Sequence, residues 1–112
     1  MNNFVNTLPI IEIAKFCQRW KVQELALFGS ALREDFSPDS DVDLLVTFTA
    51  DVDWGLLDHI KMQQELQALL HRNVDLITKR ALECSQNWFR QSEILKTAQS
   101  LFSEQKATYA TG

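Results

Sequence analysis

The sequence predicts an α/β fold in which one small β-sheet carries helices packed on it. Apolar side chains repeat at helical spacing near both ends of the chain and again in its middle. Short apolar segments with the two-residue period of a strand lie between these stretches. No internal repeat, low-complexity tract or linker interrupts the order, which is helix, strand, helical turn, strand, helix, strand, helix.

The first helix is expected from Leu8 to Trp20, with Thr7 as its cap and Pro9 in the first turn, where a missing N–H costs nothing. One apolar stripe would face the core: Ile10, Ile13, Ala14 and Cys17. A strand is expected at 22–28, and a short helical turn follows it at 31–34.

The second strand is expected at 41–48, after a loop at 37–40. Asp51 or Asp53 would cap a helix at 54–70. Its core-facing residues would include Leu57, Ile60, Leu66 and Leu70. A third strand is expected at 73–78 and a last helix at 87–103.

The length of 112 residues, 46% of them hydrophobic, predicts a single domain over 1–112 with one small core. Residues 104–112 are expected to be a frayed tail. A domain of this size has no room for separate template-binding parts, which argues against a processive polymerase and favours one small-molecule or protein acceptor.

Charge and targeting signals narrow the choice of partners. The net charge is −4 and the basic residues are scattered, so direct nucleic-acid binding is not expected. No signal peptide or long apolar run is visible, so the prediction is a cytoplasmic protein without membrane attachment. Cys17 and Cys84 lack the paired spacing of a zinc site.

Three aspartates stand where strands rarely place them. Asp41 and Asp43, two positions apart, share one face of the second strand, and Asp75 lies between Val74 and Leu76 in the third. If these strands are neighbours, the three carboxylates repel one another unless a cation lies among them. Oxygen ligands favour Mg²⁺, with Mn²⁺ as the alternative, over zinc. A charged edge that deters aggregation is the competing interpretation.

Gly29 and Ser30 lie between the end of a strand and the start of a helical turn, a place where backbone N–H groups bind phosphate. Arg33, one turn further on, could neutralise a triphosphate or simply pair with Glu34 or Asp35 at the surface. With the aspartates, this arrangement fits nucleotidyl transfer assisted by two metal ions. Asp41 and Asp43 would bridge the ions, and Asp75 would complete the site as a ligand or as the base.

The segment LALFGSALREDFSPDSDVDLLVTF resembles the signature of the DNA polymerase β-like nucleotidyltransferase superfamily, which is Gly-Ser, ten residues, Asp-x-Asp. The chain is most similar to the minimal nucleotidyltransferase (MNT) branch. The segments RNVDLITKRAL and NWFRQSEILKTAQSLF also look like that branch, so the resemblance covers nearly the whole sequence.

The resemblance implies a mixed sheet, metal ligands at Asp41, Asp43 and Asp75, and nucleotide phosphates at Gly29 and Ser30. Some branches carry Arg or Tyr at position 31 and Gly at position 34, where this chain has Ala31 and Glu34. These departures remove support for any further triphosphate contact beyond Arg33.

The resemblance also implies an antitoxin that transfers AMP from ATP to a tyrosine of a HEPN-domain ribonuclease toxin, with which it forms a hetero-oligomeric complex. ATP rests on the resemblance, because no residue of the sequence selects adenine. Two alternatives stay open. One is an antitoxin that neutralises its partner by binding alone, and the other is a nucleotidyltransferase that acts on a small molecule.

Overall fold

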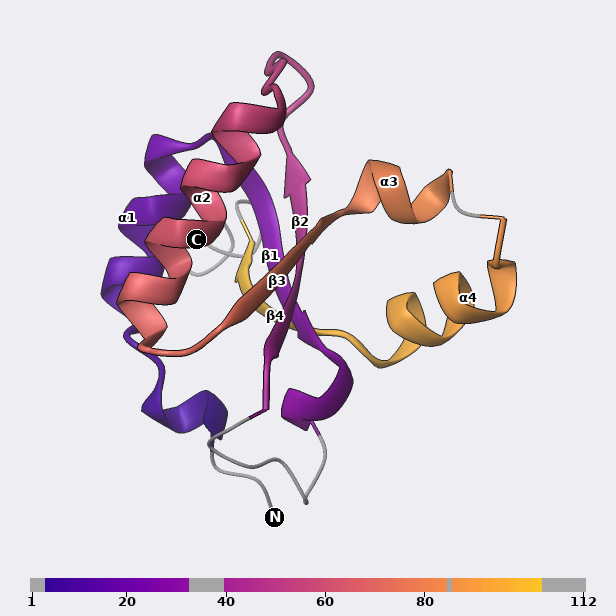
Figure 1. Cartoon of the computed structure of the whole chain (residues 1–112), viewed down its shortest axis with the longest axis horizontal. Helices are drawn as coiled ribbons and strands as arrows, with labels where there is room; N and C mark the ends of the chain where they lie inside the picture. The colour runs from indigo at the N-terminus through magenta and orange to yellow at the C-terminus, as the bar shows by residue number, and fades with distance from the viewer. Residues whose placement is uncertain (1–3, 33–39, 85, 104–112) are drawn as a thin grey trace, which may run out of the picture.

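The computed structural model describes residues 4–32, 40–84 and 86–103, which form one four-stranded sheet with helices on both sides (Figure 1). The elements in chain order are η1 (Phe4–Thr7), α1 (Ile10–Arg19), β1 (Val22–Phe28), η2 (Gly29–Leu32), β2 (Val42–Phe48), α2 (Leu56–Leu70), β3 (Val74–Thr78), α3 (Lys79–Glu83), α4 (Trp88–Thr97) and β4 (Gln99–Ser103). The predicted turn beyond Leu32, the loop at 37–39 and the tail at 104–112 lie outside the described residues.

The sheet is mixed, which confirms the predicted fold class. Its strand order is β3-β2-β1-β4. β1 runs antiparallel to both β2 and β4, whereas β2 and β3 are parallel and are joined by α2. The predicted strands agree with β1, β2 and β3 to within one residue at each end.

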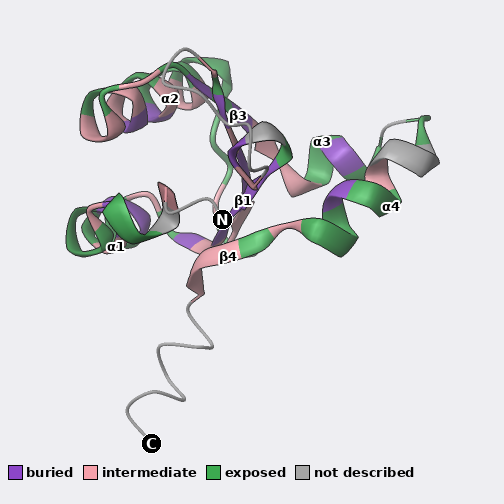
Figure 2. Ribbon diagram, turned by 90° about the horizontal axis from the view of Figure 1, so that it is seen from below, coloured by how far each residue is buried: buried purple, intermediate pink, exposed green. Residues whose placement is uncertain are grey.

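Two clusters of buried side chains lie on opposite faces of the sheet, with α1 and α2 covering one face and α3 and α4 the other (Figure 2). Alternate residues of β1, β2 and β3 supply the two clusters. In β2, Val42, Leu44 and Val46 join the larger cluster under α1 and α2, whereas Leu45 joins the smaller one. The side chain of Asp43 therefore lies on the same face as Leu45.

The start of α1 differs from the prediction. Thr7 belongs to η1, where its hydroxyl donates to the Phe4 carbonyl at 2.7 Å, and no side chain caps α1. Ile10 is 48% exposed because the buried side of the helix is formed by Ile13, Phe16 and Cys17. Phe16, which the predicted apolar stripe did not include, is buried, whereas Ile10 is not.

The C-terminal helix is also shorter than predicted. α4 ends at Thr97, and residues 99–103 form β4 against the free side of β1. Pairing in the sheet overrides the helical spacing of this segment, since Leu101 and Phe102 can then pack against the larger cluster. The predicted helix over 87–103 is therefore wrong in its second part.

The rotation of α2 differs from the prediction as well. Met62 and Leu66 are buried, whereas Leu57 is 75% and Ile60 is 42% exposed. Leu57 lies about 180° around the helix from Leu66, so both cannot face the sheet. The predicted cap is also wrong, since the helix begins after Gly55, whose N–H donates to the Asp58 carboxylate at 3.0 Å.

We expect Leu66→Ala to lower the free energy of unfolding by about 2–5 kcal/mol, because it leaves a cavity in the larger cluster. Leu57→Ala removes the same atoms from an exposed position and should change that energy by less than about 0.5 kcal/mol. Urea unfolding of both variants measures the difference. Equal losses would contradict a rotation of α2 that buries Leu66 and exposes Leu57.

Burial raises the pKa of the Cys17 thiol from its ordinary value of 9.0 to about 12. The unfolded chain therefore loses this proton first as the pH rises. The stability that the buried thiol contributes is complete below pH 9 and is lost as the pH approaches 12.

We expect the stability gap between the natural protein and Cys17→Ala to narrow by about 1.4 kcal/mol per pH unit above pH 9. Urea unfolding of the two reduced proteins between pH 8 and pH 11 measures the gap. A gap that does not change with pH would show that Cys17 does not titrate in this way.

Candidate active site

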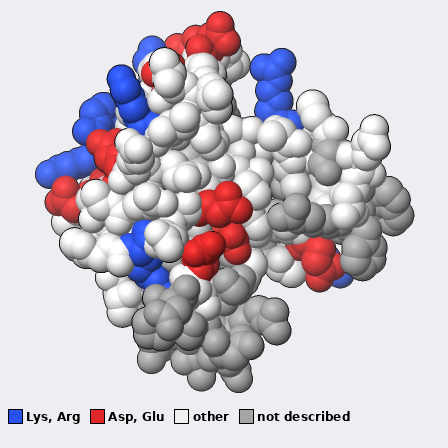
Figure 3. Space-filling view, viewed as in Figure 1, with Lys and Arg blue, Asp and Glu red and all other residues white. Residues whose placement is uncertain are grey.

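The aspartates predicted to bind metal lie where β2 and β3 begin. Asp43 and Asp75 are register partners on these neighbouring parallel strands, whose spacing is about 4.8 Å. Asp41 directly precedes β2. Asp41 and Asp75 are exposed, and Asp43 is partly buried. Figure 3 shows acidic side chains gathered in the middle of the face formed over β2 and β3.

β2 and β3 are therefore neighbours, as the prediction of a shared cation site requires. Within the described ranges, however, no three His, Cys, Asp or Glu side chains are already close enough to hold a metal ion. The three carboxylates form a candidate cation site that side-chain rotation must close.

Gly29 lies against the carboxylate of Asp43. β1 ends at Phe28, which pairs with Asp43, and Gly29 then turns the chain with a φ of +70°. A Cβ at this position would lie 3.2 Å from Asp43 Cγ and closer still to Oδ2. Only glycine fits, both because of the left-handed backbone and because of the close approach.

The other two predicted phosphate-binding residues are Ser30 and Arg33. Ser30 lies in η2, directly after Gly29. Arg33 lies outside the described residues. The structure thus joins the predicted phosphate turn to the predicted metal ligands through Gly29, and the role of Arg33 stays a prediction.

Arg72 and Asn73, which the sequence did not single out, hold the chain on both sides of Asp41. Arg72 Nη2 donates to the Ser40 carbonyl at 3.2 Å, and the Val42 N–H donates to the Asn73 carbonyl at 2.9 Å. The guanidinium of Arg72 also lies 5.1 Å from the centre of the Phe4 ring. No sequence motif marks these contacts, because they join segments about thirty residues apart.

The chain contains a second Asp-Val-Asp tripeptide, and the structure shows where it lies. Asp51-Val52-Asp53 repeats the tripeptide Asp41-Val42-Asp43 beyond the other end of β2. The pKa of Asp51 is lowered by the Thr49 hydroxyl, which donates to it at 2.5 Å, and by Lys21, whose Nζ lies 3.5 Å away. This second tripeptide is a surface turn, which makes it a matched control for the first.

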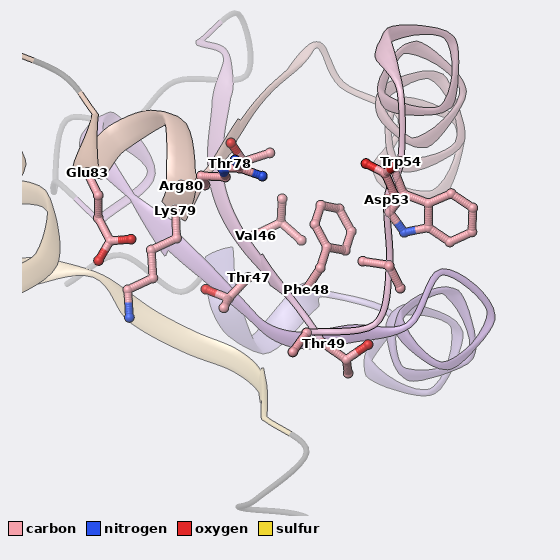
Figure 4. Close-up of a pocket in the computed structure, with 12 residues that line it drawn as sticks. Val46, Thr47, Phe48, Thr49, Asp53, Trp54, Thr78, Lys79, Arg80 and Glu83 are labelled. Carbon is pink, nitrogen blue, oxygen red and sulfur yellow. The ribbon is translucent and has the colours of Figure 1, made fainter.

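A cavity of about 390 Å³ lies at this same far end of the sheet, between the 49–54 turn and α3. Figure 4 shows Phe48, Trp54 and Thr78 around it. Trp54 is already engaged, because its ring nitrogen donates to the Trp20 carbonyl at 2.9 Å and its ring meets that of Trp20 edge-on at 5.2 Å. None of the three site aspartates lines this cavity.

The described part of the chain has no helix that is both long and apolar enough to cross a membrane.

Known proteins similar in sequence to this chain include protein adenylyltransferases. The chain is 41% identical over 66 residues to the protein adenylyltransferase MntA of Thermococcus cleftensis, which covers 59% of this chain and 65% of that protein. The alignment thus spans just under two thirds of the relative's length.

Solved structures with the same fold include a toxin–antitoxin with AMP-PNP, at 22% identity and a TM-score of 0.66, covering 89% of this chain and 77% of that one. Another is the tri-AMPylated HEPN toxin of Shewanella oneidensis in complex with MNT antitoxin. It matches at 20% identity and a TM-score of 0.58, covering 98% of this chain and 79% of that one. The family described as nucleotidyltransferase domain matches residues 10–101, which include the predicted phosphate turn and all three aspartates. The chain therefore belongs to the nucleotidyltransferase domain family.

Proposed function

We propose that this chain is a protein adenylyltransferase that acts as an antitoxin, moving AMP from ATP to a tyrosine of a HEPN-domain ribonuclease toxin. One observation carries the proposal: Asp43 lies opposite Asp75 and directly against Gly29, so the turn at Gly29 and acidic side chains meet in one place. The name of the Thermococcus relative and the two toxin–antitoxin structures support the choice of acceptor.

The residues fit a magnesium-dependent reaction. The donors are carboxylate oxygens, which suit Mg²⁺ or Mn²⁺, and Gly29 leaves room beside Asp43 that any other residue would fill. Asp41, Asp43 and Asp75 would hold the metal, with two ions expected. When bound, the metal supplies positive charge for the triphosphate and for the attacking oxygen.

In the proposed reaction, the tyrosine oxygen attacks the α-phosphorus of ATP, the bond to the β-phosphate oxygen breaks, and pyrophosphate leaves. The backbone N–H groups at Gly29 and Ser30 would bind phosphate oxygens, and Arg33 would neutralise charge on the triphosphate. The tyrosine proton passes to Asp75 or to solvent, which leaves Asp75 either a base or a metal ligand only.

The transfer would silence a ribonuclease for an electrostatic and a steric reason. An added AMP places a bulky anion beside a site that must bind RNA phosphates, so it repels and blocks the substrate. The antitoxin and its toxin would form their complex in the cytoplasm, where ATP is available.

Labelled ATP tests the reaction type directly. When the chain and its toxin are incubated with Mg²⁺, label from the α-phosphate of ATP should enter the toxin and label from the γ-phosphate should not. Incorporation from the γ-phosphate would indicate phosphorylation and would overturn the proposal. Incorporation from neither would move the proposal to the binding antitoxin.

The binding antitoxin stays as a second candidate because of one surface. Four large apolar side chains near the start of α2 are exposed: Trp54 at 36%, Leu56 at 76%, Leu57 at 75% and Ile60 at 42%. Such a cluster is typical of protein interaction sites. If binding alone neutralises the toxin, a variant without Asp41 and Asp43 should still protect cells from it.

A further inference from the structure

β3 is an edge strand, and its outer backbone groups are bound by side chains of α2. The N–H of Val74 donates to Gln67 Oε1 at 3.2 Å, and the N–H of Leu76 donates to Gln63 Oε1 at 3.2 Å. His59 Nε2 lies 2.8 Å from the Leu76 carbonyl, to which it donates. The two residues held in this way are the immediate neighbours of Asp75.

The fit between helix and strand is geometric. His59, Gln63 and Gln67 are four residues apart and form one ridge of α2. Four residues of helix rise about 6.0 Å. Two residues of strand advance about 6.6 Å. Gln63 and Gln67 can therefore each accept from one outward N–H of β3. Asp75 lies between the two residues that donate, and it pairs with Asp43 on the neighbouring strand.

We propose that Gln63 and Gln67 are positioning residues that hold β3 in register, so that Asp75 stays opposite Asp43. In the described part of the chain, β2 is the one strand neighbour of β3, and on the other side of β3 the two glutamines accept from the N–H groups of Val74 and Leu76. The inference rests on the proposed function for its consequence in catalysis, whereas its structural part concerns only the cation site. The competing role is protection of the edge from other strands.

Both glutamines act as acceptors, so one set of variants can remove the acceptor oxygens and another can restore them. Gln63→Met with Gln67→Met keeps the size of each side chain and removes the acceptor. Gln63→Glu with Gln67→Glu restores an acceptor oxygen at the same reach. Gln64→Met, at an exposed position of the same helix, controls for the substitution itself.

Two readouts need neither ATP nor toxin. In the double Met variant, hydrogen exchange at the Val74 and Leu76 amides should speed up. The affinity for Mn²⁺, measured by calorimetry, should fall about ten- to a hundredfold, as it does when groups that orient metal ligands are lost. The double Glu variant should show no such loss, because it keeps the acceptor oxygens and its added negative charges attract the cation. Gln64→Met should stay within about threefold of the affinity of the natural protein.

The kinetics of AMP transfer are the third readout and test whether the two glutamines affect catalysis. In the double Met variant, kcat for AMP transfer should fall by about the same factor as the Mn²⁺ affinity, while KM for the toxin stays unchanged. If the double variant does not fold, Gln63→Met alone is measured in the same way.

Faster amide exchange with natural Mn²⁺ affinity and kcat would overturn the proposal and leave edge protection as the role of the glutamines. Absence of Mn²⁺ binding by the natural protein would also overturn it. A fall in Mn²⁺ affinity in a chain that modifies no toxin would support the positioning role and reject the proposed function.

Discussion

Replacing Asp41 and Asp43 together by Asn should reduce AMP transfer by about a thousandfold or more, because about 4 kcal/mol of transition-state stabilisation is lost with the metal. Asn has nearly the size of Asp, and the strand that carries Asp43 is paired on both sides. The variant should therefore fold. Transfer at the natural rate would reject the assignment of the site.

The second Asp-x-Asp sequence provides the control. Asp51→Asn with Asp53→Asn makes the same chemical change in the same tripeptide at the far end of β2, and should leave the transfer rate unchanged. Mg²⁺ gives an independent readout, since an ion that binds only the folded chain raises its melting temperature. We expect this rise in the natural protein and in the control, but not in Asp41→Asn/Asp43→Asn.

Gly29→Ala should also abolish most transfer, through geometry rather than charge. The added Cβ enters the space of the Asp43 carboxylate, and the left-handed backbone costs a residue other than glycine about 1–2 kcal/mol. Either Asp43 or the turn at Gly29 must move. A displacement of about 1 Å in a catalytic site can lower the rate a hundredfold.

Gly55→Ala is the matched control for this glycine. Its φ of −92° is open to any residue, and the nearest atom to an added Cβ is 4.0 Å away. We expect natural activity and a loss of stability below about 1 kcal/mol. Rates and urea unfolding of both variants separate the two positions, and equal effects of the two substitutions would show that the contact with Asp43 is unimportant.

The parts of the fold that the sequence predicts correctly depend on local patterns. β2 has a clear two-residue period, and Gly29 marks the end of β1 because few other places in the chain hold a glycine. The sequence marks the aspartates as candidate site residues because carboxylates in apolar strands are costly without a partner. The register of Asp43 with Asp75 then follows from the parallel pairing of β2 and β3.

The parts that the sequence missed depend on contacts between distant segments. β4 forms because β1 has a side free for pairing, which no local pattern in 99–103 reveals. Leu57 fits the spacing of a core residue until the sheet selects the opposite side of α2. The contact of Arg72 with Ser40 likewise exists only once β3 lies beside β2, and that of Gln63 with Leu76 only once α2 packs along β3.

The most direct test of the central claim is the intact mass of the HEPN-domain toxin after incubation with this chain, ATP and Mg²⁺. We predict a gain of one or more AMP units with the natural protein and none with Asp41→Asn/Asp43→Asn. An unchanged mass in a mixture where the two proteins still form a complex would contradict AMP transfer and would favour the binding antitoxin.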